Sequence, residues 1–439
     1  MNMHRRDFVK NASLATAGIT ILNFPVFGKM APSNKVVLAV MGVNSRGAYL
    51  AESFAKLQNV EIAYICDVED KAIQNGLRPF AQADRKPAVV RDIRKLVALK
   101  DFDALVIAAP DHWHAPAAIL GLTNGKHVYV EKPCGHNPRE GELLSQAMVK
   151  HNKLVQMGNQ RRSFPTLQQA ATEIRNGIIG KAYMGKAWYT NNRKSIGIGK
   201  IVPVPSTLDF ELWQGPAPRR DYRDNLVHYN WHWFWHWGTS ETCNNATHEL
   251  DCCRWFLGVD YPTKVSSAGG RYAFKDDWET PDTQTACFEF GDKALITWEG
   301  RSCSGYPVEG SGRGFIIFGD KGTLVNDGNG NYKIFDLAKK LVKEVVADSK
   351  VDPDNPVSAS GDLELYHFQN FISGIRGDAN INSPVTEMQK SILLCHLANI
   401  SQRTGRTLHC SAENGHILQD SGAMQLWGRD YEKGWEPVI

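Results

Sequence analysis

The segment that follows the first apolar run of the chain could hold the phosphates of a dinucleotide. It has the sequence GVNSRG over residues 42–47, whereas the dinucleotide fingerprint is G-x-G-x-x-G, so the middle glycine is replaced by Asn44. Asparagine tolerates unusual backbone angles better than most residues, and a pyrophosphate binds at the N-terminus of the helix that follows such a turn. The cofactor-binding residues predicted in this segment are Gly42, Asn44, Ser45, Arg46 and Gly47.

An acidic residue stands where such a cofactor needs one. Asp67 ends the second apolar run, 20 residues after Gly47. A carboxylate at this place accepts hydrogen bonds from the ribose 2′-hydroxyl of NAD and repels the 2′-phosphate of NADP. The spacing therefore favours NAD, and the alternative is an ordinary turn between a strand and a helix with a capping acid.

A tryptophan-rich segment, NWHWFWHWG at residues 230–238, could hold a sugar. Sugars have flat C–H faces, which aromatic rings match, and a rim of hydroxyls, which histidines match. If the segment is an extended strand, its side chains alternate between two faces. One face then carries Trp231, Trp233, Trp235 and Trp237, and the other carries His232, Phe234 and His236. We interpret part of the segment as a sugar platform and part as core, with a wholly structural role as the alternative.

The same segment contains an H-x-x-x-H pair, which on a helix could face a metal ion. His232 and His236 lack the glutamate of the HExxH motif, and no cysteine spacing supplies further ligands. No metal site is predicted. The nine cysteines are odd in number and include no CxxC pair, so we expect most of them to be buried free thiols.

The composition is that of a soluble globular protein. The hydrophobic fraction is 42% and the charged fraction 22%. A chain of 439 residues is too long for one ordinary core, so two domains are expected. The net charge is only +3, and no stripe of lysine and arginine could neutralise a phosphate backbone, so no nucleic-acid partner is expected.

The N-terminus has the layout of an export signal. Arg5 and Arg6 precede a mildly apolar run of 16 residues, ASLATAGITILNFPVF. This run is too short and too weakly apolar to predict a membrane-spanning helix, and the paired arginines fit the twin-arginine type. We expect residues 1–33 to be an export signal and linker, and the protein to be periplasmic. A disordered cytosolic tail is the alternative.

Alternating strands and helices are predicted in the first part of the chain. The predicted strands are 35–42, 60–67, 103–110 and 127–133, and the predicted helices are 44–57 and 115–125. This alternation predicts an α/β fold with a parallel, doubly wound sheet, an NAD-binding Rossmann domain over residues 34–155.

The remainder of the chain, residues 156–439, predicts a second domain of α+β type. The segments TACFEF, ALITWEG and GFIIFGD alternate and predict antiparallel strands, and residues 386–405 predict a late helix. We expect a large open, mainly antiparallel sheet in this domain; the family resemblance described next implies that the domain binds substrate and supports oligomerisation.

The stretch PDHWHAPAAILGLTNGKHVYVEKPCG resembles the oxidoreductase family of glucose-fructose oxidoreductase and inositol dehydrogenase, the Gfo/Idh/MocA family. Its Glu131-Lys132-Pro133 triplet is the hallmark of that family, and MGNQRR, IRNGIIGK, WQGPAP and NNATHELDCCRWFLG follow in the expected order. The resemblance spans about residues 35–410. It implies a Rossmann domain and an open-sheet domain with the active site in the cleft between them, and a dimer or tetramer.

The resemblance also implies catalytic roles. Lys132 and His248 flank the substrate hydroxyl in such enzymes, where a histidine can take the O–H proton and a lysine can donate a hydrogen bond to the developing alkoxide. Asn244 stands where the family usually has an aspartate, so the site loses a charge, and we expect it to orient the substrate. Asp251, three residues after His248, is expected to contact substrate or orient the histidine.

Further residues near the cofactor and substrate follow from the same resemblance. The DHWH loop borders the nicotinamide in this family, although either of its histidines could be structural. The additional cofactor-binding residues predicted are Pro110, His112, His114, Glu131 and Lys132, and Arg161 is predicted to contact substrate.

Together these expectations describe an exported NAD-dependent carbohydrate oxidoreductase that oxidises a ring hydroxyl, with C3 as the favoured position. Because soluble NAD is scarce outside the cytoplasm, such an enzyme should hold its cofactor tightly. The first alternative is an NAD-dependent glycosidase that works by transient C3 oxidation, elimination, water addition and re-reduction. That family has a T-H-G-L-G-P-like run where this chain has THELDC at 247–252. The second alternative is a non-catalytic sugar-binding protein.

Overall fold

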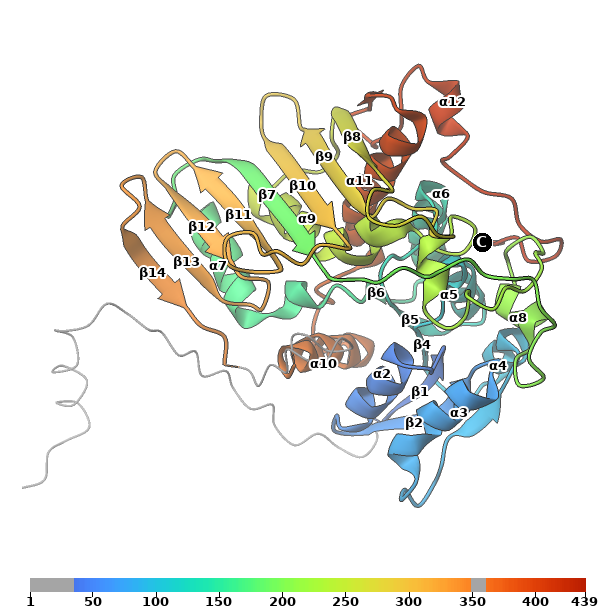
Figure 1. Cartoon of the computed structure of the whole chain (residues 1–439). Coiled ribbons are helices and arrows are strands. Elements are labelled where there is room, and N and C mark those ends of the chain that lie inside the picture. The colour runs from blue at the N-terminus through green and yellow to red at the C-terminus, as the bar shows by residue number, and fades with distance from the viewer. Residues whose placement is uncertain (1–34, 349–360) are drawn as a thin grey trace, which may run out of the picture.

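The computed structural model describes residues 35–348 and 361–439. Two sheets dominate it, a six-stranded sheet near the N-terminus and a nine-stranded sheet built from the later part of the chain (Figure 1). The predicted α/β class, with a Rossmann-type domain and a mainly antiparallel second sheet, is confirmed. The predicted export signal lies outside the described residues.

The first sheet is entirely parallel and has the strand order β3-β2-β1-β4-β5-β6. Its strands are β1 (Val36–Met41), β2 (Val60–Cys66), β3 (Ala88–Val90), β4 (Ala104–Ile107), β5 (His127–Val130) and β6 (Val155–Met157). The order reverses between β1 and β4, and ligands of doubly wound sheets bind at the carboxyl ends of the strands at such a point. All four predicted strands of this domain are present.

Helices cover this sheet, as the alternation of the sequence predicts. They are α2 (Arg46–Ala55), α3 (Asp70–Leu77), α4 (Ile93–Ala98), α5 (His114–Thr123) and α6 (Pro138–His151). Helix α2 begins two residues later than expected, because Asn44 and Ser45 form the turn that joins it to β1.

A helix from late in the sequence completes the core of this domain. Helix α10 (Leu363–Arg376) lies beside α2 in Figure 1. Its Phe368 ring lies with its centroid 5.0 Å from that of Phe54 and 6.0 Å from that of Tyr129. The chain therefore returns to the first domain after β14, and only β15 of the second sheet follows this helix.

The second sheet has the order β14-β13-β12-β11-β7-β10-β9-β8-β15. Its strands are β7 (Ala182–Thr190), β8 (Lys264–Gly270), β9 (Thr283–Glu289), β10 (Leu295–Arg301), β11 (Arg313–Gly319), β12 (Gly322–Asn326), β13 (Tyr332–Asp336), β14 (Leu341–Val345) and β15 (Leu408–His409). Every pairing is antiparallel except that of β7 with β10. The three segments predicted as strands form β9, β10 and β11.

Three helices pack on one side of this sheet. They are α7 (Pro165–Arg175), α9 (Thr247–Leu257) and α11 (Val385–Thr404), and the short α8 (Phe210–Gln214) and α12 (Ser421–Met424) lie in the connecting segments. Helix α11, the late helix that the sequence predicts, contacts both β8 and α6, and so joins the two domains. Seven of the nine cysteines are buried and all nine are free thiols. Among the described residues, no helix is long and apolar enough to cross a membrane.

Candidate active site

A cavity of about 700 Å³ lies where the two domains meet. Residues from the carboxyl ends of β1, β2, β4 and β5 line one part of it. The other part is lined by residues at the end of β7, at the start of β11, and on the segment that leads into α9. The fold therefore places the switch point of the parallel sheet opposite the second sheet, as the resemblance predicted.

The turn between β1 and α2 is held close to the neighbouring strand by its glycines. Gly42 has φ +80°, and a Cβ there would lie 2.5 Å from the backbone nitrogen of Ala109. A Cβ on Gly47 would lie 1.9 Å from the carbonyl oxygen of Gly42. Gly42 lines the cavity, whereas Gly47 is buried beneath the turn and serves its closure.

Three further residues of this turn line the cavity and leave a site that suits a phosphate. Asn44, Ser45 and Arg46 all line the cavity. No side chain of the described residues caps the N-terminus of α2, and its first turn contains no acidic residue. Free N–H groups at a helix N-terminus attract anions, so the segment fits the pyrophosphate of a dinucleotide.

Asp67 is positioned by backbone groups at the end of β2. Its Oδ2 accepts a hydrogen bond from Val43 N at 2.7 Å, and its Oδ1 accepts from Val68 N at 2.8 Å and Glu69 N at 3.2 Å. Burial raises the pKa of this carboxyl, and the hydrogen bonds lower it. Because a carboxylate oxygen has two lone pairs, Oδ2 can also accept from a ribose hydroxyl in the cavity that Asp67 lines.

Glu131 links the phosphate turn to the lysine that follows it. Its Oε1 accepts from Arg46 Nε at 2.9 Å and from Gln160 Nε2 at 3.2 Å. Arg46 also contacts Glu364 of α10 at 2.7 Å, so residues from three parts of the chain meet here. A Cβ on Gly158 would lie 2.8 Å from Glu131 Cδ, which shows how closely the backbone packs on this carboxylate.

Lys132 and Asn244 contact each other at the centre of the cavity. The Lys132 ammonium donates hydrogen bonds to the carbonyl oxygen of Asn244 at 2.6 Å and to its Oδ1 at 2.7 Å. Burial lowers the pKa of Lys132, and the carboxylates of Glu131 and Asp111 oppose that shift. Asn244 belongs to a π-helical turn, Thr242–Ala246, directly before α9, and such turns occur frequently at functional sites.

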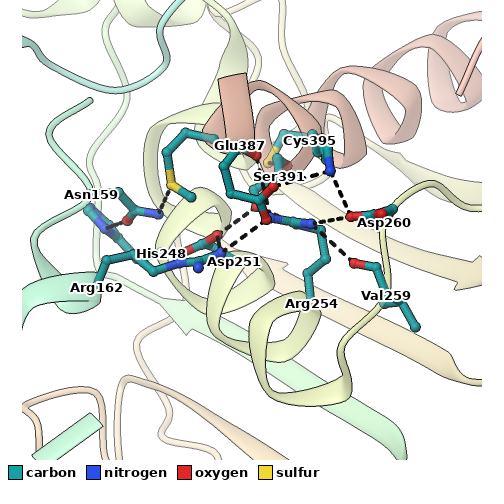
Figure 2. Close-up of polar contacts among 12 residues, drawn as sticks. Asn159, Arg162, His248, Asp251, Arg254, Val259, Asp260, Glu387, Ser391 and Cys395 are labelled. Atoms are coloured by element: carbon teal, nitrogen blue, oxygen red, sulfur yellow. Dashed lines mark hydrogen bonds and ion pairs between the residues drawn. The ribbon is translucent and has the colours of Figure 1, made fainter. Parts of the chain in front are cut away.

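His248, on the first turn of α9, lines the same cavity. Its Nδ1 lies 2.9 Å from Oδ1 of Asn159, an atom that can only accept, so Nδ1 carries the proton and Nε2 has a free lone pair (Figure 2). Burial lowers the pKa of His248 well below its ordinary value, and the positive charges of Arg161 and Arg313 lower it further. A neutral histidine of this tautomer can accept a proton at Nε2.

Asp251 does not line the cavity, contrary to the expected contact with substrate or with His248. Its carboxylate is fully buried and accepts from Arg162 Nε and Nη2, both at 2.7 Å, and from Ser391 Oγ at 2.6 Å (Figure 2). Although His248 and Asp251 are three residues apart on α9, Asp251 is turned toward α11 and is satisfied there. Arg162 and Ser391 hold the pKa of Asp251 below its usual value against the effect of burial.

The two histidines of the DHWH loop have different surroundings. His114 lines the cavity, with Nδ1 2.6 Å from the carbonyl oxygen of Pro133 and Nε2 2.7 Å from that of Ala109. His112 is fully buried, does not line the cavity, and contacts the carbonyl oxygen of Trp213 through Nε2 at 3.0 Å. The structure therefore keeps Pro110 and His114 at the predicted site and removes His112 from it.

The tryptophan-rich segment is not a strand, so the predicted alternation of its side chains is wrong. Residues Asn230–Trp233 form a 3₁₀ turn, and only Trp231 and His232 line the cavity, with ring centroids 3.6 Å apart. The other tryptophans are packed elsewhere: Trp233 against Trp278 at 4.0 Å, Trp237 against Trp213 at 5.0 Å, and Trp235 under the guanidinium of Arg403 at 4.5 Å.

Several cavity residues carry no motif and were not predicted from the sequence. They include Tyr189, Asn191, Arg193, Tyr229 and Arg313. Gln160 and the predicted Arg161, both in the MGNQRR motif, line the same cavity. Arg313 and Tyr189 are paired across the β11–β7 ladder. Only the pairing of strands far apart in the sequence brings them to His248. No cluster of three potential metal ligands occurs in residues 35–348 and 361–439.

Two parts of the chain match sequence profiles of one protein family. Residues 36–159 match the Gfo/Idh/MocA oxidoreductase family, NAD-binding Rossmann fold, and residues 193–409 match the C-terminal alpha/beta domain of the same family. Curated relatives include a protein of Shewanella baltica named glycosyl hydrolase family 109 protein and one of Shewanella oneidensis named alpha-N-acetylgalactosaminidase. Each is 30% identical over 212 residues, which cover 43% of this chain and 46% of the relative, so the chain matches about half of their length.

Solved structures share the fold over most of the chain. The WlbA dehydrogenase of Bordetella pertussis, in complex with NADH and UDP-GlcNAcA, is 19% identical, with a TM-score of 0.64, over 86% of this chain and 99% of that one. The scyllo-inositol dehydrogenase of Lactobacillus casei is 17% identical, with a TM-score of 0.61, over 85% of this chain and 99% of that one.

Proposed function

This chain belongs to the Gfo/Idh/MocA family of NAD-binding oxidoreductases, and on that premise we propose that it oxidises a ring hydroxyl, at C3, of a sugar or glycoside. One observation carries the proposal. The phosphate-binding turn, the ammonium of Lys132 and the unprotonated Nε2 of His248 meet at one cavity, next to an aromatic and histidine surface that suits a sugar.

The residues of the first domain fit the cofactor of this family. The turn at 42–47 takes the pyrophosphate, and Asp67 takes the ribose hydroxyls. Glu131 and Arg46 connect this end of the cavity to Lys132. NAD, when bound, supplies the hydride acceptor for oxidation of an alcohol.

His248 and Lys132 act on the hydroxyl from two directions. Burial and neighbouring positive charges lower the pKa of His248, so the ring is neutral before the reaction. Its unprotonated Nε2 takes the hydroxyl proton. An ammonium has three N–H donors, and Lys132 uses two of them on Asn244. The third remains for the hydroxyl oxygen, where it stabilises the negative charge that develops as the proton leaves.

The sugar is held by the residues on the opposite side of the cavity. The stacked Trp231 and His232 rings offer an apolar face with a polar edge. Arg161 and Arg193 offer hydrogen-bond donors for hydroxyl groups. The tryptophans at 233, 235 and 237 pack against other side chains and do not line the cavity.

The proposal is tested with protein purified without added cofactor. The absorbance of reduced nicotinamide is recorded while glucosides, galactosides, N-acetylhexosamines and free sugars are added, with and without NAD, and products are identified by mass spectrometry. A rise in reduced cofactor together with a ketosugar product is expected. Absence of any nicotinamide binding and any product would favour a non-catalytic sugar-binding protein.

A second candidate function is glycoside hydrolysis by transient C3 oxidation. The observation that favours this function is that relatives named as glycosyl hydrolases align with the chain. The alignment covers about half of the length of those relatives. The segment THELDC at 247–252 differs from the run found in that class, and for this reason we rank oxidation first. Release of the aglycone without net reduction of NAD in the same experiment would reverse that order.

We also propose that the protein is exported and forms a homo-oligomer. Arg5, Arg6 and the apolar run after them support a twin-arginine signal. Cell fractionation with and without a Lys substitution of both arginines tests the location, and loss of the periplasmic fraction in the variant is expected. Sedimentation of the purified protein tests for a dimer or tetramer.

A further inference from the structure

Two arginines beside the catalytic histidine share a single carboxylate. Glu249 follows His248 on α9, and its side chain is fully buried. Its Oε1 accepts from Arg161 Nη1 at 2.8 Å and from Arg313 Nε at 2.9 Å, and Oε2 lies 3.4 Å from Arg313 Nη2. Within this group of three side chains, one negative charge therefore faces two positive charges.

Both arginines line the cavity, and Arg313 is the more exposed of the two. Its side chain is 21% exposed, whereas that of Arg161 is 5% exposed. None of the described residues accepts a hydrogen bond from its Nη1, so this nitrogen is available to a ligand.

The surrounding structure fixes the Arg313 guanidinium before a ligand arrives. A Cβ on Gly328 would lie 2.5 Å from Arg313 Cγ, so the β12–β13 turn presses on the stem of this side chain. The guanidinium carbon lies 5.3 Å from the Tyr189 ring centroid. Such a preorganised guanidinium loses little further entropy on binding.

Lys132 adds a further positive charge near this group, on which the carboxylates of Glu131 and Asp111 act, and the carboxylate of Glu241 acts on Arg313. Lys132 contacts only the uncharged oxygens of Asn244, the residue that stands where an aspartate is usual. Arg193, by contrast, is matched by its own carboxylate, Glu241, at 2.5 and 3.2 Å. Burial, and then four positive groups that include Arg161 and Arg313, lower the pKa of His248.

We propose that the sugar substrate of this enzyme carries an anionic group, a carboxylate or a sulfate ester, that binds to Arg313. The inference rests on the proposed function and names the substrate class for the same site. An oxyanion that accepts from Nη1 of Arg313 compensates the second charge of the Arg161–Glu249–Arg313 group. A neutral sugar gives Nη1 of Arg313 no charged acceptor.

Matched sugars test the proposal. In the gluco and galacto series, the methyl glycoside, the corresponding methyl uronide and the 6-sulfate are compared as substrates of the NAD-loaded enzyme, and their binding is measured by calorimetry. We expect kcat/KM for one anionic member to exceed that of its neutral partner by about tenfold to a hundredfold, the range of a charged hydrogen bond. Preference for the uronide identifies a carboxylate, and preference for the 6-sulfate identifies a sulfate.

Variants separate this role from a general effect of charge. Arg313→Gln should abolish the preference for the anionic sugar and change kcat/KM for the neutral sugar much less. Arg313→Lys should keep part of the preference, because the charge remains without the planar fork. Lys333→Gln, which removes a positive charge from an exposed position on the same sheet, should keep all of it.

The outcomes distinguish failure of the substrate class from failure of the proposed reaction. Oxidation of neutral and anionic sugars with equal kcat/KM, or an equal loss for both in Arg313→Gln, overturns the inference and leaves the oxidoreductase in place. If no sugar is oxidised, the binding measured by calorimetry decides whether the site prefers an anionic sugar. Binding of the anionic sugar that is lost in Arg313→Gln supports the inference, and equal binding of both members overturns it.

Discussion

Helix α9 presents two polar residues, three positions apart, to very different surroundings. His248 faces the cavity with one nitrogen unbonded, while Asp251 faces α11 with both oxygens engaged by Arg162 and Ser391 (Figure 2). A side chain with spare hydrogen-bonding capacity toward a cavity can act on a ligand. A side chain whose capacity is used within the protein holds the helix in place. The difference teaches that the hydrogen-bond partners of a side chain, and not its residue type or spacing, distinguish a candidate catalytic group from a structural one.

The largest effect on activity is expected for a substitution on the cavity side of α9. His248→Ala removes the proposed proton acceptor, so kcat should fall by about 10² to 10⁴, the usual contribution of a general base. The melting temperature should change little, because His248 is only partly buried and makes one hydrogen bond. Steady-state kinetics with the sugar found by the absorbance assay, together with a thermal melt, measure both. A kcat close to that of the unaltered protein would remove His248 from the mechanism.

The opposite pattern is expected on the α11 side. Asp251→Ala leaves the buried Arg162 guanidinium without its carboxylate, which costs about 3 to 5 kcal/mol of unfolding free energy. Denaturant unfolding measures that loss, and Lys333→Gln is the surface control. Because the folded pKa of Asp251 is lowered, the stabilisation is complete above pH about 4 and is lost as the pH falls through the folded pKa. A catalytic defect without a loss of stability would contradict the structural role.

The cofactor end of the cavity was more predictable than the substrate end, because its residues lie close together in the sequence or at the ends of predicted strands. Gly42, Asn44 and Asp67 line the cavity at positions set by the turn after β1 and by the end of β2, and their spacing is visible in the sequence. Arg313 reaches the cavity only because β11 pairs with β7, two strands far apart in the sequence. The alternation expected for the tryptophans at 231–237 failed because a 3₁₀ turn replaces the strand, and tertiary packing decides such a choice.

Changing the positive charge beside His248 tests the role of this histidine more finely than removing the histidine itself. The pKa of His248 is lowered first by burial and then by Arg161 and Arg313, so the acid limb of kcat/KM should lie below pH about 6.5, the ordinary value for histidine. Arg313→Gln removes one of these positive charges, and the limb should move toward higher pH. The pH dependence of kcat/KM for a neutral sugar measures the shift. Lys333→Gln should leave the limb unchanged, and a limb that does not move in Arg313→Gln would show that burial alone sets this pKa.

The smallest effect is expected for two tryptophans of one segment, one of which faces the cavity while the other does not. Trp231 lines the cavity and stacks on His232, whereas Trp235 lies outside it beneath Arg403. Trp231→Leu should raise KM for the sugar by about threefold to thirtyfold, the value of one lost aromatic contact of roughly 0.5 to 2 kcal/mol, with kcat nearly unchanged. Trp235→Leu should leave KM as it is and lower only the melting temperature. Equal effects of the two substitutions on KM would mean that the segment acts through its fold, and the sugar platform at Trp231 would then be wrong.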